Sequence, residues 1–244
     1  MRSMTASRSG PSRSPRSGST PPQRTLRSET VKHYLATIYY IQYEEKRVRA
    51  SRIAEWLGVS APTVSVTLQH LAADGWLLVA PDRSVTLSPA GERAAGSIVR
   101  VHRLLERWLT DVLGFDWASA DAEAQGLAPA MSEAVADRLD AHLGQPSTCP
   151  HGNVIPGRRP PYGRLIALAD LPPGTTARVR RISEVAEHDA PQLLRQLDGY
   201  DLTIDAPVQV AEADASVGAL PVEVGGRTIA LGTSVAGLIW VEPE

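Results

Sequence analysis

The stretch ASRIAEWLGVSAPTVSVTLQHLAA, residues 50–73, decides the fold of this chain. Ile53 and Leu57 are four residues apart and lie on one face of a predicted helix. Gly58 can end that helix, and Ser60 is a favourable N-terminal cap for the helix that follows. Two helices joined by so short a turn are typical of a helix-turn-helix.

The second helix of this stretch has one buried and one exposed face. Val64, Leu68 and Leu71 follow the spacing of a buried stripe. Residues 56–73 contain no carboxylate, so the exposed face can approach a phosphate backbone without repulsion between like charges. The side chains predicted to face outward are small or uncharged: Pro62, Val66, Gln69 and Ala73, with Thr63 and Ser65 on the flanks.

A hairpin is predicted directly after the second helix. Residues 76–79 and 85–87 are two short apolar strands, and the polar turn 81–84 between them places Arg83 at its tip. A helix, a turn, a capped helix and a hairpin in this order indicate a winged helix. The alternative, a helical hairpin packed in some other core, does not account for the strands.

Length and composition limit what the protein can be. A chain of 244 residues is long enough for two domains and a tail. No apolar run approaches the roughly 20 residues of a membrane span, and the N-terminus lacks the apolar segment of a secretory signal, so we expect a cytoplasmic protein. Cys149 is the single cysteine, which excludes an internal disulfide and leaves a thiol for a metal.

Charge is unevenly distributed along the chain. The net charge is −2, but residues 1–28 contain six arginines and no acid, whereas residues 29–244 carry a net −8. Serine, proline, glycine and arginine dominate the first segment, so we expect a disordered basic tail. Residues 29–87 contain equal numbers of basic and acidic side chains, so the DNA-binding prediction rests on the motif order.

Helices are expected around the winged helix and strands toward the C-terminus. The helix predicted over 89–113, capped by Ser88, has more apolar positions than one small domain needs and is a candidate for a dimer interface. The spacing also predicts helices at 29–46, 118–127, 132–143 and 190–197, an irregular connection at 145–163, and strands at 164–168, 177–182, 207–211, 222–224 and 238–241.

Several motifs together resemble one family. They are SAPTVS at 60–65, DRS at 82–84, SPAG at 88–91, HRLLER at 102–107 and CPHGNVIPG at 149–157. With the winged helix, they make residues 29–244 similar to the diphtheria-toxin-repressor-like family of metal-dependent transcriptional regulators. The resemblance implies a repressor of iron or manganese homeostasis genes, not an enzyme, that binds a palindromic double-stranded DNA operator as a homodimer.

The resemblance also implies an α+β fold class and a domain order. The divisions that we predict are a disordered basic tail at 1–28, a winged-helix DNA-binding domain at 29–95, a helical metal-binding and dimerisation domain at 96–147, a linker at 148–172, and an SH3-like, FeoA-type β-barrel at 173–244.

Carried over position by position, the family's DNA contacts fall on the helix-turn-helix and the wing. Phosphate contacts would set the position of the protein on DNA, while Pro62 and Thr63 would reach thymine methyl groups or base edges. The family often has glutamine where this chain has Val66, so direct base readout shifts toward Gln69. The implied DNA-binding residues are Ser51, Arg52, Ser60, Pro62, Thr63, Ser65, Gln69 and Arg83.

A metal site is expected on the long helix. His102 and Glu106 are four residues apart, so their side chains share one helical face; they form either an ordinary His–Glu pair or two ligands of one ion. The resemblance favours a ligand pair and implies that an ancillary site is completed by Asp121, Asp189 and Gln192; Cys149 and His151 correspond to further ligands in some members, and not all of these residues can bind one ion at once. The cofactor is a divalent transition metal, Fe²⁺ or Mn²⁺, with Zn²⁺ or Co²⁺ as further candidates; a thiolate from Cys149 favours iron, zinc or cobalt over manganese.

The family's primary metal site is degenerate in this sequence. Its positions are occupied by His33, Gln125, Ala128 and Pro129, of which the last two have no side-chain donor. Either the metal signal has moved to the ancillary site, or the protein is a winged-helix regulator that answers to another signal. An enzyme built on Cys149 and His151 is disfavoured, because the sequence places no orienting carboxylate next to them.

Overall fold

The computed structural model describes residues 29–45, 47–189, 191–211 and 218–244, without the side chains of residues 185, 187, 189 and 191. The tail predicted at 1–28 lies outside the described residues. The helices are α1 (Glu29–Glu44), α2 (Ala50–Leu57), α3 (Ala61–Ala73), α4 (Pro89–Asp111), α5 (Trp117–Leu127), α6 (Glu133–His142), α7 (Glu184–Asp189), α8 (Pro191–Gly199) and α9 (Thr233–Ala236), with single 3₁₀ turns η2 (Ala128–Ala130) and η3 (Leu168–Asp170).

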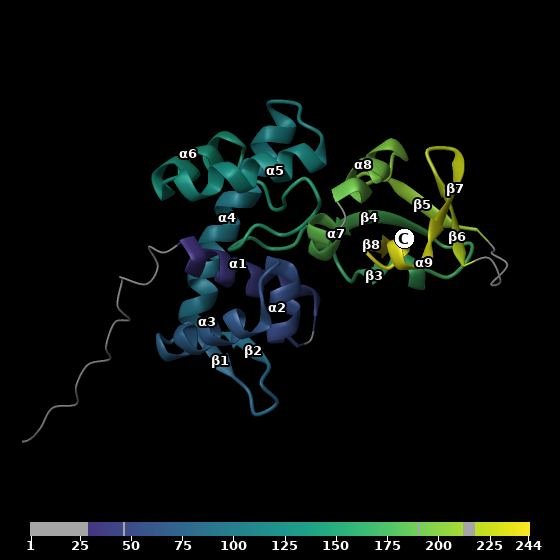
Figure 1. Ribbon diagram of the computed structural model, residues 1–244. Coiled ribbons are helices and arrows are strands. Elements are labelled where there is room, and N and C mark those ends of the chain that lie inside the picture. The colour runs from purple at the N-terminus through teal and green to yellow at the C-terminus, as the bar shows by residue number, and fades with distance from the viewer. Residues whose placement is uncertain (1–28, 46, 190, 212–217) are drawn as a thin grey trace, which may run out of the picture.

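The predicted winged helix is present at the N-terminal side of the molecule (Figure 1). Gly58 ends α2 with a positive φ of 63°, and the side chain of Ser60 accepts a hydrogen bond from the Thr63 amide to cap α3. Strands β1 (Leu77–Val79) and β2 (Val85–Leu87) form the antiparallel wing. Apolar side chains of α1, α2, α3 and the wing bury one another in a core of their own.

Helix α4 joins the winged helix to the helical domain. Its first half places Ala95 and Val99 in the core of the winged helix, and its second half places Leu104, Leu105 and Leu109 in a separate core with α5 and α6. Because α4 is one continuous helix, it fixes the position of the winged helix relative to the helical domain.

A six-stranded antiparallel sheet forms the C-terminal domain, with the strand order β3-β8-β4-β5-β6-β7. Its strands are β3 (Ile166–Ala167), β4 (Thr176–Ile182), β5 (Pro207–Val210), β6 (Ala219–Val224), β7 (Arg227–Gly232) and β8 (Ile239–Pro243). The predicted α+β class is confirmed. Strand β7 is absent from the sequence prediction. Strand β3, which pairs with the distant β8, lies within the strand predicted at 164–168, although the same residues also fall in the range 148–172 assigned to a linker.

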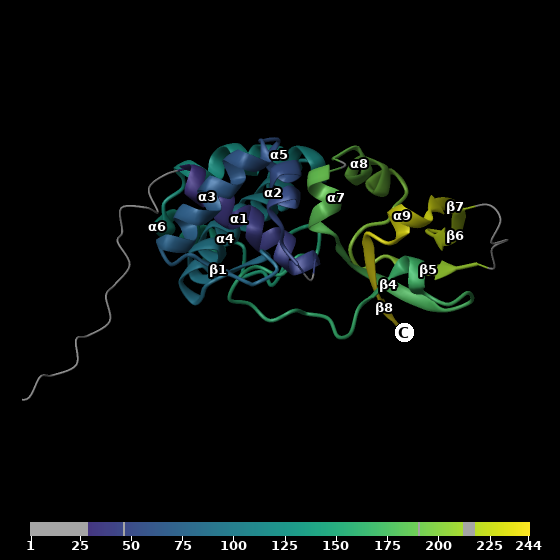
Figure 2. The same ribbon diagram turned by 60° about the horizontal axis from the view of Figure 1, so that its bottom comes forward.

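The sheet domain packs against the helical part of the molecule through α5, α7 and α8 (Figures 1 and 2). Trp117 and Ala118 of α5 belong to the same buried cluster as the strands of the sheet. No helix within the described ranges combines the length and the apolar character needed to cross a membrane.

Candidate metal centre

Five of the predicted metal ligands come together where α4, α5 and the Cys-Pro-His loop meet. His102 Nε2 lies 3.1 Å from Asp121 Oδ1 and 3.5 Å from Glu106 Oε1. On the other side of Glu106, the same Oε1 atom lies 3.4 Å from His151 Nδ1, which is 3.8 Å from Cys149 Sγ. Glu106 is therefore shared by two groups of three potential ligands, each with its donor atoms within 4.8 Å of one another.

The loop that carries Cys149 and His151 is fixed by backbone contacts. The carbonyl of His151 accepts a hydrogen bond from the Ile182 amide of β4, at 2.9 Å. Gly152 has a φ of +83°, and a Cβ atom there would lie 2.0 Å from the carbonyl oxygen of Arg180, so only glycine fits between His151 and the sheet. The indole of Trp117 meets the His151 ring edge-on, with 5.2 Å between centroids.

The electrostatics of the cluster favour a cation. Burial raises the pKa of Glu106, but the facing imidazoles of His102 and His151 outweigh burial and hold that pKa well below its usual range. Burial lowers the pKa of His102, yet Glu106 and Asp121 overcome it and raise the pKa to about 10. The carboxylates thus stabilise positive charge at this point, either a proton on His102 or a bound cation.

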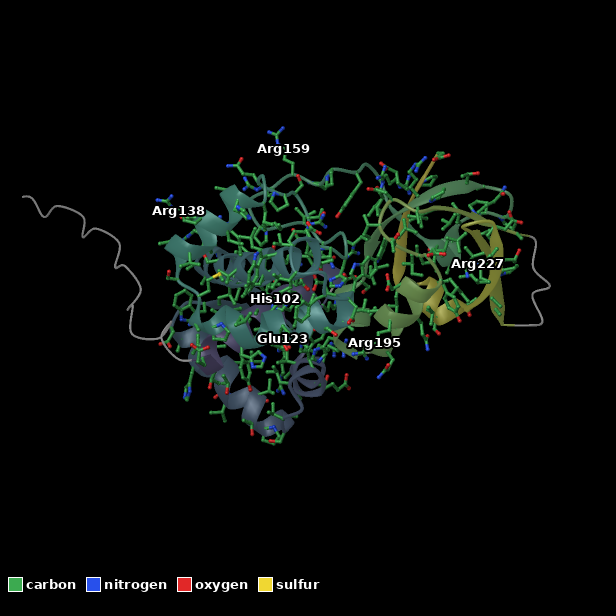
Figure 3. The ribbon with its side chains drawn as sticks, turned by 90° about the horizontal axis from the view of Figure 1, so that it is seen from above. His102, Glu123, Arg138, Arg159, Arg195 and Arg227 are labelled. Carbon is green, nitrogen blue, oxygen red and sulfur yellow. The ribbon has the colours of Figure 1, made fainter. Side chains whose placement is uncertain are left out.

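The donor set fits a divalent transition metal. Glu106 Oε1 is buried and makes no hydrogen bond of good geometry to any described residue, although two imidazoles face it. Ligand atoms about 2.0–2.3 Å from one tetrahedral ion stand roughly 3.3–3.8 Å apart, which matches the separations on the Glu106–Cys149–His151 side. Figure 3 shows His102 within the helical domain, whereas Arg138 and Arg159 project from its outer edge.

Two residues of the predicted ancillary set are not placed at this cluster. Gln192 lies exposed on α8 and accepts a hydrogen bond from Arg195. Asp189 ends α7, and its side chain lies outside the described part of the structure. The roles of Gln192 and Asp189 as metal ligands stay predictions, since the sequence pattern placed Gln192 on a helix but did not fix the direction of its side chain.

The four positions of the degenerate primary site line one cavity of about 910 Å³. His33 comes from α1, and Gln125, Ala128 and Pro129 come from the end of α5 and the turn after it. Within the described residues, His33 belongs to neither group of three potential ligands.

A buried ion pair beside the cluster was not foreseen from the sequence. Arg103, between His102 and Glu106 on α4, donates to a carboxylate oxygen of Glu184 in α7 and to the carbonyl of Val154. Burial raises the pKa of Glu184, and the pair is almost completely shielded from solvent. A buried arginine needs an acidic partner. The sequence does not show which acid this is, because 81 positions separate Arg103 from Glu184.

The residues predicted to contact DNA lie on α2, α3 and the wing. Ser51, Pro62, Thr63, Ser65 and Gln69 are exposed, and so is the cap residue Ser60. The hydroxyl of Ser65 donates to the Ala61 carbonyl at 2.9 Å, and Thr63 lies within hydrogen-bonding distance of Ser60. Arg83 is at the tip of the wing, in the left-handed region with a φ of 62°.

Arg52 is arranged differently from the other predicted DNA contacts. Its guanidinium donates to Glu45 at 2.8 Å, lies 3.7 Å from Glu55 and covers the Trp56 ring at 5.3 Å. These contacts hold the side chain of Arg52 against the winged helix. A contact between Arg52 and DNA would therefore require some of them to break.

Fold and cluster together define a winged-helix DNA-binding protein with a buried cluster of potential metal ligands in its helical domain. Models for the iron dependent repressor family match in chain order: the N-terminal DNA binding domain at residues 27–85, the metal binding and dimerisation domain at 88–157, and the FeoA domain at 166–243. The chain belongs to the iron-dependent repressor family, which confirms the resemblance inferred from its motifs.

Characterised relatives match along nearly their whole length. The iron-dependent repressor IdeR of Mycobacterium tuberculosis is 36% identical over 225 residues, covering 88% of this chain and 97% of the relative. The diphtheria toxin repressor of Corynebacterium diphtheriae is 33% identical with the same coverage. A solved structure, a manganese-dependent transcriptional repressor complex with manganese, is similar with a TM-score of 0.79 and 34% identity, covering 88% of this chain and all of that one.

Proposed function

We propose that this protein is a metal-responsive, DNA-binding transcriptional repressor of iron or manganese homeostasis genes, without enzymatic activity of its own. It acts in the cytoplasm as a homodimer on a palindromic operator. The observation that carries the metal response is the buried cluster centred on Glu106, in which two imidazoles, two carboxylates and one thiol converge. The names of the relatives and the match to a DNA binding domain support the same conclusion.

In this proposal the ligands are His102, Glu106, Asp121, Cys149 and His151. A bound divalent ion would supply positive charge that links α4 and α5 to the loop. Ala95 and Val99, earlier on α4, belong to the core of the winged helix. Because the cluster and this core are attached to one helix, a displacement of the cluster would move the winged helix with it. A metal that binds the DNA-competent arrangement more tightly shifts the population toward it.

The alternative, a regulator that answers to another signal, is less well supported. Loss of donors at Ala128 and Pro129 removes the usual primary ligands, but the cluster around Glu106 retains a full set of oxygen, nitrogen and sulfur donors. We place the metal response at this cluster and give His33 no part in it.

The test is a metal titration of purified protein with Fe²⁺, Mn²⁺, Co²⁺ and Zn²⁺, followed by operator binding in metal and in chelator. His102→Ala and Glu106→Ala should each lower metal affinity by at least tenfold and abolish metal-dependent DNA binding, because each deletes a ligand atom. His33→Ala is the matched histidine control and should behave as the wild type. Equal DNA binding by all four proteins with and without metal would overturn the proposal.

A further inference from the structure

Helix α7 of the sheet domain lies between that domain and the winged helix in both ribbon views (Figures 1 and 2). His188, near its end, stacks flat on the indole of Trp56, with ring centroids 4.1 Å apart and planes 3° from parallel. Its Nε2 atom is 2.8 Å from the Trp56 carbonyl, the distance of an N–H donated to that oxygen. Both interactions therefore join the sheet domain to one residue of the helix-turn-helix.

Trp56 lies where its contact with His188 can affect the orientation of α3, the helix predicted to contact DNA. It is the next-to-last residue of α2 and is 8% exposed. Two residues later, Gly58 turns the chain toward α3. Holding the indole and the carbonyl of Trp56 fixes the end of α2, and so the direction in which α3 leaves the turn.

The opposite end of α7 is anchored by buried charges. Glu184 accepts from Arg103 of α4, and its amide donates to a carboxylate oxygen of Glu44, the last residue of α1, at 3.2 Å. Glu44 also accepts from Arg181 of β4. A buried ion pair tolerates little displacement, since separating it leaves uncompensated charge. The position of α7 relative to α1 and α4 is thereby defined.

Arg103 brings this anchor into contact with the candidate metal centre. It is flanked on α4 by His102 and Glu106, and it donates a second hydrogen bond to Val154, in the loop that carries Cys149 and His151. Helix α7 is therefore tied to the metal-site loop through Arg103 at one end and to the turn of the helix-turn-helix at the other.

We propose that α7 is a coupling element of the repressor, and that His188 is a positioning residue which acts through Trp56 to orient α3 for DNA. This inference rests on the proposed function and adds a route from the metal centre to DNA through the sheet domain. Because His188 itself is exposed, its substitution removes the stacking contact without opening the core.

The experiment compares wild type, His188→Ala, His188→Phe and the control Tyr200→Ala, which removes an exposed aromatic ring from the sheet domain directly after α8. The probe is a DNA fragment selected by the Mn²⁺-loaded wild type from a random-sequence library. At saturating Mn²⁺, His188→Ala should weaken DNA binding about three- to tenfold, as expected for one lost aromatic stack. Phenylalanine keeps a flat ring on Trp56 and should restore most of the affinity, and Tyr200→Ala should change nothing.

Two further measurements separate positioning from a structural role. The Mn²⁺ affinity of His188→Ala should equal that of the wild type because the ligands are unaltered, and its melting temperature should fall by only a few degrees because one stacking contact is lost while the cores stay filled. If His188→Ala binds DNA like the wild type, or if phenylalanine fails to rescue it, the coupling role of His188 is wrong while metal-dependent binding by the wild type still stands. If the wild type binds DNA equally in chelator and in Mn²⁺, the proposed function itself fails.

Discussion

At the scale of single residues, Glu106 holds the candidate metal centre together. One carboxylate faces His102 on its own helix and His151 on a loop 45 positions further along the chain, and it is 1% exposed. A buried carboxylate between two imidazoles is costly in free energy unless positive charge compensates it. A proton on His102 would supply that charge, and a divalent ion would supply more.

The thiol of Cys149 should determine which metals bind well. It is 1% exposed and close to His151, so a bound ion on that side of Glu106 would gain a soft sulfur ligand. We expect Cys149→Ser to lower Zn²⁺ and Co²⁺ affinity by about tenfold or more and Mn²⁺ affinity by less.

Absorption spectroscopy of the Co²⁺-loaded protein checks the role of Cys149 directly. The wild type should show a near-ultraviolet charge-transfer band from thiolate to cobalt, and Cys149→Ser should lack it. Identical spectra for the two proteins would remove Cys149 from the ligand set.

A second residue-scale prediction concerns Asp140, which accepts from Arg100 at 2.7 Å and from Arg158 at 2.6 Å. Burial raises the pKa of Asp140, but these guanidinium groups outweigh burial and hold that pKa below its usual range. Asp140→Asn should therefore lower the free energy of unfolding by about 1–3 kcal/mol at pH 7. Asp137→Asn, which loses only an exposed contact to Arg100, should cost less than about 1 kcal/mol.

The pH dependence of the Asp140 effect follows from the sign of the shift. A carboxylate with a lowered pKa in the folded state stabilises the protein above its unfolded pKa of about 3.9, and the contribution is lost as pH falls through the folded value. Urea unfolding in chelator at pH 7 and near pH 3 should show the difference between wild type and Asp140→Asn shrinking at the lower pH. A constant difference would contradict the ion-pair explanation.

At the scale of elements, local signals predicted α1 to α6 and α8, whereas the short helices α7 and α9 and the contacts between residues far apart in the sequence were not predicted. Ser60 and Ser88 cap α3 and α4 by accepting amide hydrogen bonds, so the starts of both helices follow from the sequence. Strand β7 was missed because its pattern of mostly exposed residues lacks a buried alternation. The same limit applies to the site, where α4 placed His102 beside Glu106 but no local pattern paired Arg103 with Glu184.

The helix-turn-helix and the wing lead to a prediction about DNA. Thr63→Ala should weaken operator binding by removing a contact at the start of α3, and Arg83→Ala should weaken it by removing a phosphate contact at the wing. Arg83→Ala should also reduce the slope of log K against log salt concentration by about 0.9, the value for one phosphate contact.

Gel-shift titrations at several salt concentrations measure both quantities. Arg227→Ala, on the exposed hairpin between β6 and β7 of the sheet domain, is the matched arginine control and should leave affinity and slope unchanged. Wild-type affinity in both Thr63→Ala and Arg83→Ala would refute this assignment of contacts.

At the scale of the whole molecule, three buried cores are joined by shared elements instead of free linkers. Helix α4 contributes to the first two cores, and Trp117 of α5 belongs to the third. Each core therefore includes residues of an element that also contributes to a neighbouring core. The chain therefore presents its DNA-reading surface and its candidate metal centre as parts of one body.

Several apolar side chains are exposed on the helical domain, and they lead to a prediction about assembly. Five large apolar residues there are at least 37% exposed: Val112, Leu113, Phe115, Leu127 and Val135. Exposed apolar groups on a domain matched by a dimerisation model indicate a surface covered by a second copy. Sedimentation at micromolar concentration should show a dimer without DNA.

Substitution of Val135 tests whether this surface forms the dimer. Val135→Asp places a charge on α6 within the surface, and burying that charge at an interface should weaken dimerisation by at least tenfold. Val79→Asp is the matched control, because Val79 is 56% exposed where Val135 is 54% exposed, but it lies on the wing. A monomeric wild type would contradict the predicted dimer. If Val135→Asp dimerises as tightly as Val79→Asp, α6 is excluded from the interface.

A monomeric Val135→Asp should still bind metal, since the ligands all come from one chain. It should bind a single operator half-site only weakly, because it has lost the second DNA-binding helix.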